Sequence, residues 1–486
     1  MGKTESVTFS TVLIVYLALF TATSTYPFFW DTVQLASKHA TWFYQNGFKN
    51  LLLPTCIDSG HFPALGLYLA FAWKVFGRTL LVSHLIMLPF VLGIIWQSWL
   101  LIRKIFSGKW RSLAFVILLS DPVLMAQCTL VSPDVFLVFF FLMALNYGIF
   151  GKKRIWFVVA LTGLSASSLR GIICTSAIFI ADVIINLRLN YKENPKGLPG
   201  KIIKISSEVI VPYIPALLFT ISFLTWHLFK TGWIGYNKES PWYDSFRPAG
   251  FTGLIRNIFI ICWRLADFGH IFICISSILC LCHNLRHKTE LPEKLSKLLT
   301  ILIVIFVFIS APMLLHKNLS GHRYLLPVYI MLSLSVCFYL FEIIRNNIVK
   351  NVFAFIMMAG LITGNLWVYH DKISQGWDAS LAYLPYPVLR KEMMKEMERM
   401  SVPVNETGSA FPNLAIIDFI DLNGNMSSFA EKNFKTNKYI FWSNVFNDFS
   451  DDEIDRLKSE WIKMKEYKCM NVKVVLYKYP GLSHNY

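Results

Sequence analysis

Long hydrophobic runs, separated by short polar segments, fill the chain as far as about residue 370. Most of these runs approach the length of about 20 residues that a helix needs to cross a bilayer. The pattern therefore predicts a polytopic α-helical membrane domain over residues 1–370. Eleven spans are expected, at about 7–28, 80–102, 112–130, 135–150, 155–169, 172–187, 206–229, 258–282, 298–315, 324–343 and 351–370.

The segment 29–77, between the first two spans, has a mixed and aromatic pattern. Its residues Ala36–Tyr44 are amphipathic, and Ala64–Phe76 is an apolar run that is too short to span. A run of that length suits a helix lying in the membrane interface. We therefore expect a first external loop that contains interfacial helices and does not cross the bilayer.

The tail, residues 371–486, has the alternating and polar pattern of a small α/β domain outside the membrane. Strands are predicted at Leu414–Phe419, Tyr439–Trp442 and Val472–Tyr479, and an amphipathic helix at 387–400. Ser450 and Glu453 form a capping box before a helix whose predicted apolar face is Ile454, Leu457, Trp461 and Met464. The pattern leaves open whether this domain only stabilises the protein or also positions a substrate.

Composition supports a membrane protein, since 55% of the residues are hydrophobic and only 16% are charged. The net charge of +16 does not indicate a nucleic-acid partner, because the basic residues cluster in short loops between the runs. Such clustering is typical of cytoplasmic loops. With a cytoplasmic N-terminus, every basic loop falls on the cytoplasmic side. The following residues then fall on the external side: Asp31, His61, Asp134, Arg170, Asp244 and His322.

Asp31 follows the aromatic cluster Phe28-Phe29-Trp30 at the end of the first span. A carboxylate at the edge of an apolar span is costly, so it is a functional candidate. Asp134 begins a span after Pro133 and has helix capping as its plainer interpretation. The plainer interpretation of Asp31 is likewise a solvated residue that ends a helix.

Arg170 and Arg323 lie at span ends on the same side. Their fixed N–H donors suit phosphate oxygens, although interfacial anchoring is the commoner role of such arginines. Arg264, Asp267 and His270 recur one helical turn apart, which is typical of a buried ion pair with a histidine partner.

Glycosyl transfer from a lipid phosphate needs carboxylates, cations with several N–H donors, and a site at the edge of the membrane, here lined by aromatic residues. One carboxylate deprotonates an acceptor hydroxyl, and the cations stabilise the departing phosphate. The sequence has no Gly-rich phosphate loop, so a nucleotide-sugar donor is not supported.

At these residues the chain resembles the GT-C class of membrane glycosyltransferases, and most of all the superfamily of protein O-mannosyltransferases and lipid A aminoarabinose transferases (glycosyltransferase family 39-like). The second acid that often follows the first-loop Asp in that superfamily is missing here, and the resemblance covers about residues 7–345. The motifs that carry it are Trp30-Asp31-Thr32, Gly60-His61-Phe62-Pro63, Tyr68, Phe76-Gly77, Ser132-Pro133-Asp134, Arg170-Gly171 and Arg323-Tyr324-Leu325-Leu326-Pro327.

The resemblance implies an inverting glycosyltransferase that moves a sugar from a polyprenyl-phosphate donor to a hydroxyl acceptor on the external face. It implies Asp31 as the base, Asp134 as a residue that orients the acceptor, and His61, Arg170 and Arg323 as donor-phosphate ligands. Further candidates for substrate binding are Trp30, Asp58, Tyr68, Asp244, Arg264, His270, His322 and Tyr324. Some relatives bind a divalent metal near the first-loop motif. Asp58 and His61 could supply ligands, but two candidates are too few to predict a metal.

Two other classes fit a polytopic chain: a transporter or lipid flippase without bond chemistry, and a structural membrane subunit. A transporter is expected to show internal repeats, which are absent from the sequence. We expect a bacterial inner membrane with the site facing the periplasm. The alternative is the endoplasmic reticulum with a lumenal site, which the Asn-x-Ser/Thr sequences at Asn318, Asn405 and Asn425 would fit.

Overall fold

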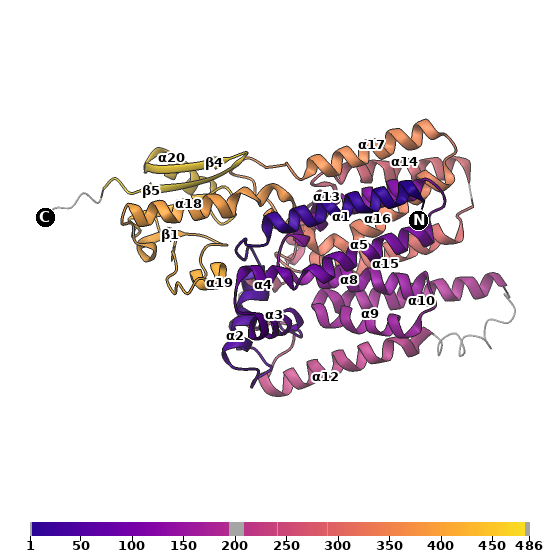
Figure 1. Cartoon of the computed structure of the whole chain (residues 1–486), viewed down its shortest axis with the longest axis horizontal. Coiled ribbons are helices and arrows are strands. Elements are labelled where there is room, and N and C mark those ends of the chain that lie inside the picture. Colours follow the sequence, from indigo (N-terminus) through magenta and orange to yellow (C-terminus); the bar gives the residue numbers. More distant parts are fainter. Residues whose placement is uncertain (1, 194–208, 241, 289, 482–486) are drawn as a thin grey trace.

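The structure, a computed structural model, describes residues 2–193, 209–240, 242–288 and 290–481. It consists of a long bundle of helices with a small sheet-containing domain at one end (Figure 1). The N-terminus lies at the opposite end of the bundle (Figure 1). Part of the predicted basic loop that includes Lys196, Lys201 and Lys204, and the start of the predicted span 206–229, lie outside the described residues.

Seven helical segments among the described residues are long and apolar enough to cross a membrane. They are α1 (Lys3–Thr23), α4 with α5 (Leu80–Leu85, Leu88–Ile105), α10 (Leu169–Glu193), η4 with α12 (Val211–Tyr213, Ile214–Thr231), α15 (Glu293–Leu315), η6, α16 and η7 (His322–Leu325, Leu326–Phe338, Tyr339–Ile343), and α17 (Asn347–Gly364). The count becomes nine if each of two bent pairs is one span. The first pair is α6 (Trp110–Leu119) with α7 (Pro122–Cys128), bent by 64°.

Two shorter apolar segments, α8 with η2 (Pro133–Ala144, Leu145–Ile149) and α9 (Arg154–Ser167), occupy the two remaining predicted spans. The prediction of a many-spanning helical membrane protein is thus confirmed. Eleven crossings would require both short segments and both bent pairs to cross.

The predicted continuous span over 258–282 is wrong. The chain forms α13 (Gly250–Ala266) and α14 (Ile271–His287), which meet at 96°. Gly269 sits at the break with a positive φ, and a Cβ there would lie 1.9 Å from the carbonyl oxygen of Gly360. The start of α13 is hydrogen-bonded to the end of α15, where Ala249 N donates to Leu315 O at 2.9 Å. Because its other end meets the end of α17, α13 lies across one end of the bundle.

The segment 29–77 forms short helices, as predicted. It contains η1 (Val33–Lys38), α2 (His39–Gln45) and α3 (Ala64–Phe76), and α3 has the bounds expected for the interfacial helix. Arg78, just beyond α3, forms an ion pair of 2.8 Å with Asp418 of the C-terminal domain. The loop and the domain are therefore joined directly.

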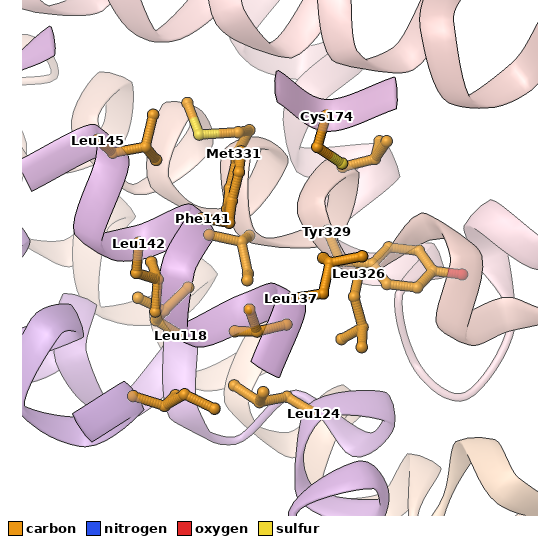
Figure 2. Close-up of a cluster of buried hydrophobic side chains, with 14 of the residues drawn as sticks. Leu118, Leu124, Leu137, Phe141, Leu142, Leu145, Cys174, Leu326, Tyr329 and Met331 are labelled. Atoms are coloured by element: carbon orange, nitrogen blue, oxygen red, sulfur yellow. The ribbon is translucent and has the colours of Figure 1, made fainter. Parts of the chain in front are cut away.

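The centre of the bundle is packed around α8 and α16, and α16 is almost wholly buried. Figure 2 shows side chains from α6, α7, α8, α10 and α16 meeting there, among them Leu118, Leu137, Phe141 and Met331. Within a bilayer this packing stabilises the bundle through van der Waals contacts between helices, because lipid tails are as apolar as leucine. This packed centre holds in place the helix ends that carry the polar residues.

The C-terminal domain has a five-stranded sheet of order β2-β1-β3-β5-β4. Its strands are β1 (Thr407–Ser409), β2 (Ala430–Glu431), β3 (Tyr439–Ser443), β4 (Ile462–Cys469) and β5 (Val472–Lys478). The helices around it are α18 (Pro385–Arg399), α19 (Ile417–Asp421) and α20 (Asp451–Ser459). The α/β prediction is confirmed, as are β3, β5, α18 and the Ser450 capping box.

Two details of the domain were predicted wrongly. The segment 414–419 was expected to be a strand, but it leads into the short helix α19. The helix after Ser450 ends at Ser459, so Met464 lies on β4 and only Ile454 and Leu457 of the predicted face belong to α20. The strand β4 was not predicted, because this exposed, lysine-rich edge strand does not alternate clearly between apolar and polar residues.

Basic loops gather at the bundle end that lies away from the sheet. Lys294 Nζ donates to Lys104 O at 2.8 Å, and Arg111 pairs with Glu5 at 3.3 Å. The basic loops and the acidic candidates therefore lie at opposite ends of the bundle, as predicted. The acidic candidates lie at the end that carries the C-terminal domain.

Candidate active site

Asp31 is presented by a sharp turn after α1. Trp30 has a φ of 57°, which reverses the chain so that Asp31 begins the next helical segment. Thr32 holds the turn, since Phe29 N donates to Thr32 Oγ1 at 2.9 Å. The Phe29 ring stacks on Tyr383 of the C-terminal part at 4.8 Å. The position of Asp31 therefore depends on both parts of the chain.

Asp134 lies in the first turn of α8, and its side chain is fully buried. The N-cap is Ser132, whose Oγ accepts from Asp134 N at 3.2 Å. The capping role considered for Asp134 thus belongs to Ser132, and the Asp134 carboxylate is free to pair elsewhere. A negative charge in the first turn is also favoured by the helix dipole.

Arg170 lies in the first turn of α10, just after the break that separates α9 from α10 at Ser168. The next residue has to be a glycine, because a Cβ on Gly171 would lie 1.9 Å from Leu164 O. The close approach of the two helices places the Arg170 guanidinium against Asp134, with which it forms an ion pair.

Arg323 joins the candidate residues. It pairs with Asp31, lies 3.6 Å from Asp134 through Nη1, and lies 3.4 Å from Asp378 through Nε. Arg170 Nη1 donates to the backbone oxygen of Arg323 at 3.3 Å. Both guanidinium groups lie over the Tyr324 ring, at 4.4 and 5.4 Å from its centre.

This cluster, which we call the arginine cluster, contains Asp31, Asp134, Asp378, Arg170 and Arg323. Three carboxylates face two guanidinium groups, and Asp31 keeps 20% of its side chain exposed while Arg323 keeps 4%. Burial raises the pKa of the Asp378 carboxyl to about 6, even though Arg323 counteracts the shift. The charges of the cluster balance when Asp378 is protonated and carry one negative charge in excess when it is ionised, and a bound anion competes with these carboxylates for the same two cations.

A cavity of about 170 Å³ opens beside the arginine cluster. Most of its lining is apolar, with side chains from α10, α15 and the loop before α13. The charged and aromatic residues that reach it are Arg170, Arg323, His61, Tyr324, Trp242 and Phe246. Cations at the end of an apolar cavity suit a ligand with an anionic head and a hydrocarbon tail.

Asp378 is the functional candidate that the sequence did not reveal. It lies in η8 (Trp377–Ala379), and its backbone oxygen accepts from Gln127 Nε2 at 2.7 Å. Gly376 allows the same segment to approach His322, since a Cβ there would lie 2.5 Å from His322 Nδ1. A Trp-Asp pair occurs here and at Trp30-Asp31, and this repetition is the signal that could have pointed to Asp378.

A second buried cluster, which we call the Asp267 cluster, lies nearby and contains Arg264, Asp267, His322 and Tyr369. Asp267 Oδ2 lies 2.6 Å from His322 Nε2 and 3.7 Å from Arg264, and Tyr369 donates to Oδ1. The predicted buried ion pair is present, but its histidine is His322. His270 instead contacts Asp121 at 2.8 Å.

Asp58 is also paired inside the protein. Its Oδ2 lies 2.9 Å from His227 Nε2, and its Oδ1 accepts from Gly60 N at 2.8 Å. The imidazole Nδ1 of His61 donates to Phe62 O at 3.0 Å, so the ring faces the cavity without joining Asp58. No group of three or more His, Cys, Asp or Glu that could hold a metal occurs among the residues that the structure describes.

Three further candidate substrate residues belong to neither cluster and do not line the cavity. The Tyr68 hydroxyl donates to Ile86 O at 3.1 Å, and its ring packs on Phe90 and Phe136. The Asp244 side chain is 80% exposed beside Arg247. The Trp30 ring packs against Phe411 at 4.9 Å. The structure does not bring these side chains to the cavity.

The fold is similar to that of a solved membrane glycosyltransferase. Crystal structures of ArnT from Cupriavidus metallidurans match with a TM-score of 0.51, in the apo state and bound to undecaprenyl phosphate. The match to the bound form covers 98% of this chain and 99% of that chain at 11% identity. The match to the apo form covers 96% and 97% at 12% identity.

No family model matches the chain, and no curated protein matches it. The match to ArnT extends over both the helical bundle and the C-terminal part, because it covers nearly the whole of both chains. The resemblance to lipid A aminoarabinose transferases of the GT-C class that the motifs indicated is confirmed at the level of the fold.

Proposed function

We propose that this protein is an inverting membrane glycosyltransferase that takes a sugar from a polyprenyl-phosphate donor. The observation that carries the proposal is the convergence of Asp31, Asp134, Arg170 and Arg323, from four distant segments, beside an apolar cavity. The neighbour's crystal form with undecaprenyl phosphate supports a lipid donor of this class. The donor's prenyl chain would run from the cavity toward the bilayer.

Arg170 and Arg323 bind the donor phosphate in this proposal. Both line the cavity, and guanidinium groups offer paired N–H donors that fit phosphate oxygens. As the bond between sugar and phosphate breaks, these donors stabilise the negative charge that collects on the leaving group. Burial lowers the pKa of His61, so this imidazole donates to phosphate only in the minority of molecules that carry the extra proton.

Asp31 is the base. It is the more exposed of the two predicted catalytic carboxylates, so an acceptor hydroxyl can reach it. Asp31 removes the hydroxyl proton while the acceptor oxygen attacks the anomeric carbon from the face opposite the phosphate. The electron pair of the broken bond leaves with polyprenyl phosphate, and the sugar's configuration inverts. Phosphate binding to Arg323 loosens its pair with Asp31 and makes that carboxylate a better base.

Asp134 orients the two arginines and acts on the acceptor only through them, because its side chain is fully buried. Its two oxygens face Arg170 and Arg323 from a fully buried position, which fixes the spacing of the two guanidinium groups. The acceptor in this proposal is a hydroxyl of a protein, lipid or polysaccharide.

We further propose that the arginine cluster faces the periplasm of a bacterial inner membrane. The basic loops at the opposite bundle end support this orientation through the positive-inside rule. A reporter fused after Gly108 is therefore expected to read as cytoplasmic. A periplasmic or lumenal signal from that fusion contradicts the orientation.

The decisive experiment is sugar transfer by the purified protein in liposomes. A polyprenyl-phosphate sugar, labelled in the sugar, is supplied with membrane lipid and polysaccharide acceptors. We expect the label to leave the prenyl lipid with inverted configuration, while a nucleotide sugar gives no transfer. Movement of intact labelled lipid across the bilayer without bond cleavage would instead identify a flippase.

A further inference from the structure

A second polar pocket lies at the start of α13, separate from the cavity of the arginine cluster. Its volume is about 410 Å³, and the two share no lining residue. Three cations line it, Arg247, Arg256 and Lys317, and none of its lining residues is acidic. The nearest acid contact is Asp244, 3.4 Å from Arg247. The pocket therefore has an excess of positive charge.

Hydrogen bonds to backbone oxygens hold the three cations together. Lys317 N donates to Arg247 O at 2.8 Å, and Arg256 Nη2 donates to Lys317 O at 2.6 Å. The bridge between Pro248 and His316 closes the same junction. Two segments that are far apart in the chain thus place like charges side by side, which is unfavourable unless an anion or solvent compensates.

The helix α13, which supplies Thr252, Gly253 and Arg256 to the pocket, also carries an exposed apolar stripe. Phe251, Ile255 and Phe259 recur every four residues and are 80%, 43% and 71% exposed. Asn257 and Ile261 on the other side of the helix are buried. A helix with such a stripe that lies across the end of a membrane bundle suits insertion among acyl chains, with its basic residues at headgroup level.

We propose that the pocket of Arg247, Arg256 and Lys317 binds the phosphate of an anionic membrane lipid, whose acyl chains cover Phe251, Ile255 and Phe259. The three cations favour an anionic headgroup. The adjoining apolar stripe favours a lipid over free phosphate, because acyl chains would cover it. The proposal does not depend on the proposed glycosyl transfer. The pocket is nonetheless close to the reaction site, because Phe246, the residue before Arg247, lines the other cavity.

The test uses the full chain in a neutral detergent micelle that contains phosphatidylglycerol or phosphatidylcholine. Native mass spectrometry counts the lipids that remain bound. We expect the wild-type protein to retain phosphatidylglycerol about tenfold better than phosphatidylcholine, because each basic group near an anionic headgroup favours it. In Arg247→Gln/Lys317→Gln this preference should disappear.

The matched control is Lys435→Gln/Lys468→Gln, which removes two exposed cations from the C-terminal domain and should keep the preference. If the pocket variant unfolds, Lys317→Gln alone repeats the test, because the Lys317 backbone bonds are unchanged. An equal retention of both lipids by the wild type, or a preference that survives the pocket substitutions, overturns the proposal. Displacement of phosphatidylglycerol by an equal concentration of inorganic phosphate overturns the assignment to a lipid.

Discussion

The arginine cluster and the Asp267 cluster have similar compositions but different surroundings. Each pairs aspartate with arginine at the same end of the bundle. In the Asp267 cluster both carboxylate oxygens accept from fixed partners, His322 on one side and Tyr369 on the other. In the arginine cluster both cations also line a cavity. Access to a ligand, rather than buried charge, therefore separates a candidate site from a structural network.

The largest expected effect is the loss of sugar-transfer rate in the variant Asp31→Asn. Loss of a general base commonly costs 10²–10⁴ in rate, so we expect transfer to fall by about a thousandfold. The fold should persist, since Arg323 keeps Asp134 and Asp378 as partners. Sugar release in liposomes measures the rate, with Asp244→Asn as the exposed control. Normal turnover by Asp31→Asn would remove this residue from the mechanism.

The Asp267 cluster should respond to mutation through stability. Asp267→Ala leaves His322 and Arg264 without their buried anion, which costs about 3 kcal/mol of unfolding free energy. Chemical unfolding in micelles measures this loss, and Asp244→Ala should change stability by less than about 0.5 kcal/mol. The rate per folded molecule should stay within about threefold. A stable but inactive Asp267→Ala would mean that the two clusters act as one site.

Arg170→Lys tests whether the arginine cluster binds the donor through geometry as well as charge. Lysine keeps the charge but cannot reach Asp134 and the Arg323 backbone oxygen together. We expect the KM for the prenyl donor to rise about tenfold, with a smaller fall in kcat. Arg456→Lys, an exposed substitution on α20, is the control. Unchanged donor KM would exclude Arg170 from phosphate binding.

The smallest expected effect is a pH dependence of donor binding. The pKa of Asp378 lies above its ordinary value, so its carboxyl is neutral below about pH 6 and charged above it. The charged form competes with the donor phosphate for Arg323. Donor affinity should therefore fall about fivefold as the pH rises through 6. Titration with a prenyl-phosphate sugar, a phosphodiester whose charge stays at −1 over this range, should show this step in the wild type and not in Asp378→Asn.

Hydrophobic periodicity predicted most of the helices, because spans and interfacial helices differ in length and in flanking residues. Ala64–Phe76 is the clearest case. The same signal failed over 258–282, because two apolar helices joined at Phe268-Gly269 have the hydropathy of a single span. Only tertiary packing, the fit of Gly269 against Gly360, reveals the bend.

Four residues of the arginine cluster could be predicted because polar residues at the ends of apolar spans are conspicuous in the sequence. The contacts between them became visible only in the structure. Asp378 was missed because it lies in an irregular segment with no periodicity to mark it. His227 and Asp121 were missed because their apolar neighbours suggested ordinary spans, although an acid within an apolar run was itself a sign. Such long-range pairs cannot be read from spacing along one chain.

The attachment of Asp378 to Gln127 has a consequence for protein engineering. The segment that begins the C-terminal part supplies a countercharge to Arg323 and a stacking partner to Phe29. In a hybrid that joins this bundle to the tail of another transferase, Arg323 would lose one of its carboxylate partners. The turn at Trp30 would also lose the ring that packs on Phe29. The two parts should therefore be exchanged only with the segment 376–383 kept from the parent that supplies the bundle.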